Sequence, residues 1–310
     1  MSRPARRGLL PAGVQDPAGL SRLLTAAGYL PDEGVATAAY LALALPRPLF
    51  LEGEAGVGKT SLATALATVV GADLLRLQCY EGIDASQALY DWDFPRQLLH
   101  LRAAESAGTA AGAADAERLE SELYSRRFLL ARPLLAALET SPAVLLVDEV
   151  DRADDQFEAF LLEVLSDYTV TVPELGTVRA EVPPVVVVTS NRTREVHDAL
   201  KRRCLYHWVE HPDFDREVAI VRQRVPEASA SLAAQVARAV AVLRAEDLLK
   251  SPGVAETIDW TQALVALGAD RLDAGTAAAT LGAVLKYRED QLHVQRLDVQ
   301  QLISTAVLGG

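Results

Sequence analysis

The sequence has few cysteines and no long hydrophobic run. Its 310 residues include two cysteines, Cys79 and Cys204, whose wide separation does not indicate a disulfide framework, so a reducing compartment fits best. No apolar run approaches the roughly 20 residues that a membrane-spanning helix needs. The N-terminal MSRPARRGLLPAG lacks the apolar stretch of a signal peptide. These absences predict a soluble, cytoplasmic protein with no membrane span.

Basic and aromatic residues are also scarce. The chain has 30 Lys and Arg residues against 42 Asp and Glu residues, a formal net charge of −12. Because nucleic-acid-binding domains carry a basic field, this balance argues against a nucleic-acid partner. Half of the residues are apolar, 23% are charged and only 5% are aromatic. This composition is typical of a globular, helix-rich protein with a mostly aliphatic core.

Short apolar runs alternate with helical segments in the first two thirds of the chain. Continuous runs of this kind are typical of strands buried on both faces, and they occupy residues 47–53, 73–79, 143–149 and 183–191. The alternation predicts an α/β fold, with a mostly parallel sheet sandwiched by helices.

The organisation changes near residue 213. Residues 1–31 carry turn-forming Pro and Gly and indicate a loose N-terminal arm, followed by a helix at 32–45. Strand signals almost vanish after residue 213, where helical periodicity takes over. We therefore expect an α/β domain over residues 1–213 and a small all-α domain over residues 214–310.

A phosphate-binding loop follows the first predicted strand. The segment from Gly53 to Thr60 matches the pattern GxxxxGK[ST], with an apolar strand before it and a helix after it. Glycines let backbone N–H groups surround a phosphate, and the helix N-terminus adds its positive dipole end. Lys59 is expected on the β- and γ-phosphates and Thr60 on Mg²⁺. The predicted nucleotide-binding residues are Gly53, Glu54, Ala55, Gly56, Val57, Gly58, Lys59, Thr60 and Ser61.

The third predicted strand ends in two carboxylates, Asp148 and Glu149. This position places Asp148 beside the phosphate loop, where it helps to hold Mg²⁺ together with Thr60. Glu149 is then placed to polarise an attacking water molecule. A base beside the Mg²⁺ aspartate suits hydrolysis, and residues 191–194 do not supply the Asn-Lys-x-Asp segment that reads guanine. The sequence therefore predicts ATP as substrate and Mg²⁺ as cofactor.

Three polar residues after the fourth strand are further candidates. Asn191 falls at the edge of the sheet where ligands collect, and it serves there either as a group that holds the attacking water or γ-phosphate or as a turn residue. Arg202 and Arg203 precede another strand-like segment. They are either solvated or ion-paired, or one of them reaches a neighbouring subunit's ATP site as an arginine finger.

The order of these parts resembles the AAA+ ATPases. More narrowly, it is similar to the MoxR branch, and within it to the ATPases encoded with carbon monoxide dehydrogenase and related molybdenum hydroxylases. The resemblance covers about residues 25–295 and is carried by LFLEGEAGVGKTSLA, RLQCYEGIDASQALYDWDFPRQLLHLR, LLVDEVDRADDQFEAFLLEVL, SNRTREVHDALKRRCLYHWVEHP, GVAETIDWTQAL and LKYREDQ.

The resemblance implies a P-loop NTPase of the AAA+ type, with the all-α domain as a lid. It implies a homo-oligomeric ring, usually a hexamer, with ATP bound between subunits. It implies Asn191 as a sensor and Arg203 as the finger, with Arg202 as a second candidate. It also implies a partner with a von Willebrand factor A domain, and chaperone-like maturation of a metalloenzyme client such as a molybdenum hydroxylase.

Some other segments agree with this pattern, and others do not. A hairpin over residues 169–179 matches the branch, whereas no arginine follows Pro252 and Gly253 at the start of the lid helix, so we assign no second sensor. Residues 80–101 form either a client-gripping loop or an irregular connection with partly buried aromatics. Residues 103–114 are Ala/Gly-rich and without features of their own, and they indicate either a surface insertion or a poorly ordered connection.

Three other functions remain open at this point. The chain could be a P-loop kinase for a small molecule, with the acceptor pocket in the helical domain. It could be a nucleotide-gated binding module with little turnover, which the missing lid arginine supports. A nucleic-acid motor or loader is the third alternative, and the acidic balance argues against it.

Overall fold

The computed structural model describes residues 9–106 and 113–297. The chain divides into two compact units. The first contains the residues up to Leu23, Glu33–Glu52 and Ala63–His207. The second contains Leu24–Asp32, Gly53–Leu62 and the residues from Trp208 onward.

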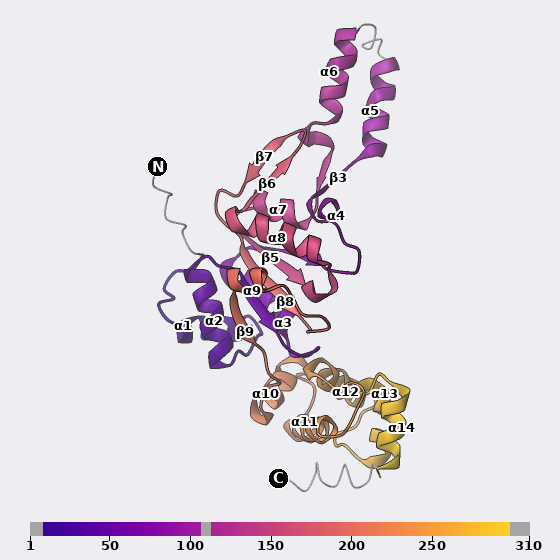
Figure 1. The fold of residues 1–310 in the computed structure, drawn as a ribbon. Helices are drawn as coiled ribbons and strands as arrows, with labels where there is room; N and C mark the ends of the chain where they lie inside the picture. Colours follow the sequence, from indigo (N-terminus) through magenta and orange to yellow (C-terminus); the bar gives the residue numbers. More distant parts are fainter. Residues whose placement is uncertain (1–8, 107–112, 298–310) are drawn as a thin grey trace. The chain divides into compact units, whose positions relative to one another are not determined.

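A five-stranded sheet forms the centre of the first unit, with the strand order β2-β5-β8-β1-β9 (Figure 1). The strands are β1 (Leu49–Glu52), β2 (Asp73–Gln78), β5 (Ala143–Asp148), β8 (Val185–Ser190) and β9 (Leu205–Trp208). The pairs β2–β5, β5–β8 and β1–β8 are parallel. The carboxyl ends of these four strands therefore meet at one edge of the sheet.

Both faces of the sheet are covered, as the continuous apolar runs predict. Every residue of β5 and β8 is buried. Successive strand residues point to opposite faces, and one set, including Leu145 and Val186, packs into a core with the helices on that side. Val144 and Val187 point the other way and are equally buried. The predicted mostly parallel sheet flanked by helices is confirmed.

The expectation of a loose N-terminal arm over residues 1–31 is wrong for residues 17–26, which form a helix with Leu20 and Leu24 fully buried. The helices around this sheet include those expected at residues 32–45, after the phosphate loop and at 155–167, which lie close to their predicted positions. They are α1 (Pro17–Ala26), α2 (Glu33–Ala44), α3 (Lys59–Val70), α4 (Ala85–Leu89), α7 (Pro133–Glu139), α8 (Asp155–Asp167) and α9 (Asp198–Arg203), with short 3-10 turns η1 (Arg126–Phe128) and η2 (Val150–Arg152). Asp154 caps α8, because its carboxylate accepts the N–H of Phe157. The amphipathic pattern over residues 155–167 thus predicted this helix correctly.

Two small antiparallel ribbons extend the first unit. The predicted hairpin is confirmed as β6 (Thr169–Val172) paired with β7 (Gly176–Arg179). The other ribbon pairs β3 (Tyr90–Trp92) with β4 (Leu129–Ala131).

Two helices connect β3 to β4 and lie side by side in Figure 1. They are α5 (Phe94–Ser106) and α6 (Ala113–Leu123). Gln97 Nε2 in α5 donates to Leu123 O at 2.7 Å, and His100 lies 3.1 Å from Glu122. The expectation that residues 103–114 lack features is wrong for the described part, which is helical. Residues 107–112 lie outside the described residues.

Five helices form most of the second unit: α10 (Phe214–Arg224), α11 (Ala230–Arg244), α12 (Val254–Ala266), α13 (Ala274–Val284) and α14 (Arg288–Arg296). Trp260 is fully buried among their aliphatic side chains, and its indole N–H donates to Thr280 Oγ1 at 2.7 Å. None of the described helices is both long and apolar enough to cross a membrane.

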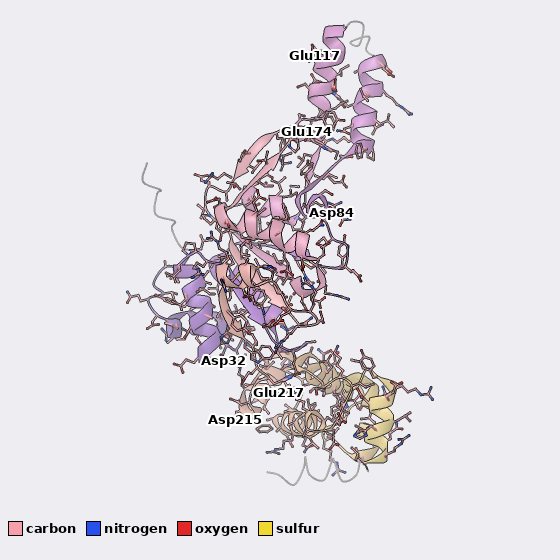
Figure 2. The ribbon with its side chains drawn as sticks, viewed as in Figure 1. Asp32, Asp84, Glu117, Glu174, Asp215 and Glu217 are labelled. Atoms are coloured by element: carbon pink, nitrogen blue, oxygen red, sulfur yellow. The ribbon has the colours of Figure 1, made fainter. Side chains whose placement is uncertain are left out.

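A buried ion pair links these helices. The Glu217 carboxylate, labelled in Figure 2, accepts two hydrogen bonds from the Arg244 guanidinium at 2.7 and 2.8 Å and a third from Thr257 Oγ1 at 2.6 Å. Arg244 also donates to Pro252 O at 2.7 Å. The pair therefore ties α10 and α11 to the start of α12.

Candidate active site

The phosphate loop follows β1 and leads into the first turn of α3. Gly56 and Gly58 have φ values of +81° and +96°, which favour glycine, so both fit the predicted loop. Lys59 begins α3, and its Nζ donates to Gly53 O at 2.7 Å and to Glu54 O at 2.6 Å. The ammonium group is therefore held against the loop. Thr60 and Ser61 follow in the same helical turn.

The same loop packs directly on the start of α12, within the second unit. A methyl group on Gly253 would lie 2.8 Å from Ala55 O and 2.9 Å from Gly56 Cα. The Val254 N–H donates to Gly56 O at 3.1 Å. Only glycine at residue 253 allows this approach. The pattern of the family predicts an arginine here, and the backbone contact could not be predicted, because it depends on a fold that no local pattern encodes.

A second close approach lies at the beginning of the loop. A methyl group on Gly53 would lie 2.4 Å from Val209 O, and Glu54 lies 3.0 Å from His211 Nε2. The first glycine of the motif is therefore required for packing against the segment before α10 as well as for the turn.

Asp148 ends β5 and is held by two neighbouring strands. It is 3% exposed. Thr189 Oγ1 in β8 donates to Asp148 Oδ1 at 2.6 Å, and the Arg76 guanidinium in β2 donates to Oδ2 at 2.5 Å. The sequence analysis assigned no role to Thr189 or Arg76. Their positions at or near the carboxyl ends of parallel strands are the signal that could have identified them.

Glu149 has a left-handed backbone conformation, with φ 55° and ψ 52°. Its Oε1 accepts from Asn191 Nδ2 at 3.0 Å, and its Oε2 accepts from Gln78 Nε2 and an Arg152 guanidinium nitrogen, both at 3.1 Å. Its own N–H donates to Thr189 Oγ1 at 2.9 Å. The structure thus brings Glu149 and Asn191 together, from the ends of neighbouring strands.

Asp151 fixes the loop that carries Asn191. This carboxylate is 2% exposed and accepts the N–H of Asn191 at 3.2 Å. It also accepts the N–H of Thr193 at 2.8 Å and its hydroxyl at 2.7 Å. The sequence analysis did not single out Asp151, although a third acid after a strand end is a visible signal. It positions Asn191 through the backbone.

The two candidate arginines differ in what they contact. The Arg203 guanidinium donates to Leu165 O and Ser166 O, at the carboxyl end of α8. Arg202 is exposed and forms an ion pair with Asp198, 3.6 Å away on the same helix. In this chain Arg203 stabilises a helix terminus, and the Arg202 guanidinium faces solvent.

Both cysteines are buried as free thiols. Burial raises the pKa of each thiol to about 12, and Asp148 contributes to the shift at Cys79. Neutral thiols are poor nucleophiles and poor metal ligands. Among the described residues, no group of three or more His, Cys, Asp or Glu side chains is placed to hold a metal ion.

A family comparison agrees with this arrangement. A model of the AAA domain, dynein-related subfamily, matches residues 48–204, just over half of the chain. The chain belongs to the AAA domain family. The match begins just before β1 and ends after α9, so it contains the phosphate loop, both carboxylates, Asn191 and both arginines. A search among curated proteins finds no match.

Some solved structures match this chain at low sequence identity. The Thermotoga maritima RuvB Holliday junction branch migration motor is 16% identical with a TM-score of 0.45, over 85% of this chain and 66% of that one. A proline-to-glycine variant of the same protein is 14% identical with a TM-score of 0.49, over 98% and 81%. Domain III of the T. maritima replication initiation protein DnaA is 17% identical with a TM-score of 0.45, over 84% and 96%. The AAA chain described here thus spans just under two thirds of the first of these proteins.

Proposed function

We propose that this AAA protein hydrolyses ATP and uses the energy to remodel a protein partner. The hydrogen bond between Glu149 and Asn191 is the observation that carries the proposal. It joins a base candidate and an amide at the sheet edge where β5 and β8 end. A strand end with two merely solvated acids would not need such a partner.

The residues divide the chemistry among them. The N–H groups of the loop 53–58 and the Lys59 ammonium bind the phosphates, and the helix N-terminus favours their charge. Glu149 orients a water molecule and accepts its proton, while Asn191 holds the carboxylate and the water in line. A general base of this kind contributes about 10²–10⁴-fold to a rate.

The donor set fits Mg²⁺. The Thr60 hydroxyl and the Asp148 carboxylate are hard oxygen ligands of the kind that Mg²⁺ prefers, and Asp148 is buried with an oriented carboxylate. Bound Mg²⁺ supplies charge neutralisation on the phosphate oxygens. The Arg76 guanidinium and the Thr189 hydroxyl each donate to one oxygen of Asp148, so this carboxylate is held in a fixed orientation.

An arginine from a neighbouring subunit completes the proposed site in a ring, usually a hexamer. The resemblance favours Arg203, whereas the contacts favour Arg202, because its side chain is 81% exposed and, among the described residues, forms an ion pair only with the equally exposed Asp198 one helical turn away. An ion pair this exposed contributes little and is readily exchanged for another partner. The exposed Arg202 side chain can extend to a neighbour at the cost of this weak ion pair with Asp198.

The ring is tested by the ATPase rate as a function of protein concentration, with mass measured in parallel. A specific activity that rises as rings form supports a shared site. Arg202→Ala should then assemble and lose activity. The matched variant Arg203→Lys keeps a donor for the α8 carbonyls and should retain activity if Arg202 is the finger. A constant rate from a monomer, indifferent to both changes, contradicts the shared site and favours the small-molecule kinase or binding module.

We further propose that the protein belongs to the MoxR branch of its subfamily and acts in the cytoplasm as a chaperone for a metalloenzyme, with residues 214–310 as its lid. The motifs over residues 25–295, the β6–β7 hairpin before β8 and the acidic charge support this assignment. Purified protein should form an ATP-dependent complex with a von Willebrand factor A domain protein encoded beside it. A complex that forms equally well with Lys59→Ala, which lacks the phosphate-binding ammonium, argues against nucleotide control.

A further inference from the structure

Glu256 places a negative charge against the phosphate loop. It lies in the first turn of α12, and its Oε2 accepts the N–H of Gly253 at 2.9 Å. The same oxygen is 3.1 Å from the position of a methyl group built on Gly56. Since Gly56 is in the middle of the loop, the carboxylate lies within van der Waals reach of the segment that binds phosphate.

The start of α12 is also bonded to this loop through its backbone. Val254 N–H donates to Gly56 O at 3.1 Å, so the loop can move away from the helix that carries Glu256 only if this hydrogen bond breaks. Both belong to the same compact unit. A charge at this point therefore acts on the loop from a fixed position.

No basic side chain among the described residues forms an ion pair with this carboxylate. Arg244 donates to Pro252 O close by, but its guanidinium is engaged by both oxygens of the buried Glu217. Glu256 is half-buried, so solvent screens it only in part. Its charge will interact with the charge of whatever occupies the loop.

We propose that Glu256 senses phosphate in the loop by repulsion: a bound nucleotide weakens the contact between α12 and Gly56, and this contact in turn weakens nucleotide binding. The inference rests on the proposed ATP site. It assigns Glu256 as a positioning residue, at the place where the sequence analysis looked for an arginine. An arginine there would draw the lid onto the phosphates, whereas the carboxylate opposes that movement. Thermodynamic linkage requires the two effects to be equal and reciprocal.

Glu256→Gln tests the charge without removing the helix cap, because the side-chain oxygen of glutamine can accept the Gly253 N–H as the Glu256 carboxylate does. Asp259→Asn is the matched control, since it removes the same charge from the same helix at an exposed position paired with Lys286. Affinities of the full chain for ATP and ADP are measured by titration at low and high salt. Glu256→Gln should tighten ATP binding at low salt by about three- to tenfold, and ADP binding by a smaller factor. At high salt the gain in affinity should be smaller for both nucleotides, because salt screens the repulsion.

Hydrogen exchange at the Val254 amide gives a direct readout of the contact. ATP should increase exchange at this amide in the wild type and in Asp259→Asn, and change it little in Glu256→Gln. Equal ATP affinity for the two variants, or weaker binding by Glu256→Gln, would overturn the proposal and leave Glu256 as a helix cap only. Failure of the wild type to bind ATP would instead refute the proposed ATP site itself.

Discussion

Replacing Gly253 by alanine isolates the contact between the phosphate loop and the lid helix. The backbone of Gly253 has φ −86° and ψ −174°, which alanine adopts freely, so the substitution causes no backbone strain. The added methyl group would lie 2.9 Å from Gly56 Cα. This is about 0.6 Å closer than the separation of roughly 3.5 Å at which carbon atoms attract. The loop and the helix start must therefore move apart.

The magnitude follows from two losses and one gain. Overpacking costs about 1–3 kcal/mol, and separation also weakens the hydrogen bond from Val254 to Gly56 O, which contributes about 1 kcal/mol. Alanine restricts the unfolded chain and returns about 0.4–1 kcal/mol. The net loss of stability is about 1–3 kcal/mol, or several degrees in melting temperature. Because this separation also moves the Glu256 carboxylate away from the loop, ATP binding should tighten.

The assay compares thermal unfolding and ATP titration for wild type, Gly253→Ala and Gly282→Ala. Gly282 lies within α13, where an added methyl group meets only Gln291 Nε2 at 3.8 Å. Alanine there should raise stability by about 0.5–1 kcal/mol, as expected in a helix interior, and leave ATP affinity unchanged. If Gly253→Ala melts at or above the wild-type temperature and binds ATP normally, the close packing at this contact is refuted.

Four further predictions concern individual side chains. Arg244→Met should destabilise the helical unit by about 3–5 kcal/mol in chemical denaturation, because it leaves the Glu217 charge buried without its partner. Tyr29→Phe should keep or raise the melting temperature, because its hydroxyl is buried and has no hydrogen-bond partner among the described residues. Tyr40→Phe should lose about 0.5–1.5 kcal/mol, since that hydroxyl donates to a backbone carbonyl at 2.9 Å. Burial raises the pKa of each of the two cysteine thiols from 9.0 to about 12. The thiols should therefore contribute stability that is complete below pH 9 and is lost as the pH rises toward 12, because only the unfolded state ionises in that range. If the unfolding midpoint does not decrease as the pH rises above 9, the burial of the thiols is contradicted.

The sheet and most helices could be predicted because each rests on a local signal. The four buried strands appear as continuous apolar runs, and α8 appears as an amphipathic pattern with Asp154 as its cap. Glu149 and Asn191 could be expected close together, since parallel strands share one edge. The hydrogen bond that joins them depends on the left-handed turn at Glu149, which no pattern in the sequence announces.

The remaining features depend on contacts between distant residues. The β3–β4 ribbon pairs Trp92 with Leu129, and short strands with such separate partners carry a weak signal. The sequence around Arg203 gives no sign of a structural role. That role follows from a tertiary contact, because the carboxyl end of α8 lies beside the Arg203 guanidinium in the folded chain. The sequence shows that the lid helix begins without an arginine. It does not show that Gly253 and Glu256 contact the phosphate loop at that position. The roles of the individual site residues and the domain boundary at residue 213 stay predictions.

A single-turnover experiment with wild type and Glu149→Gln tests the central claim most directly. Glutamine keeps an oxygen that can accept from Asn191, and it loses the ion pair with Arg152, whose side chain is 58% exposed, so the fold should be preserved. The account predicts that both proteins bind ATP with similar affinity, while phosphate release by Glu149→Gln falls by about 10²-fold or more. Phosphate release by the variant at close to the wild-type rate would contradict it.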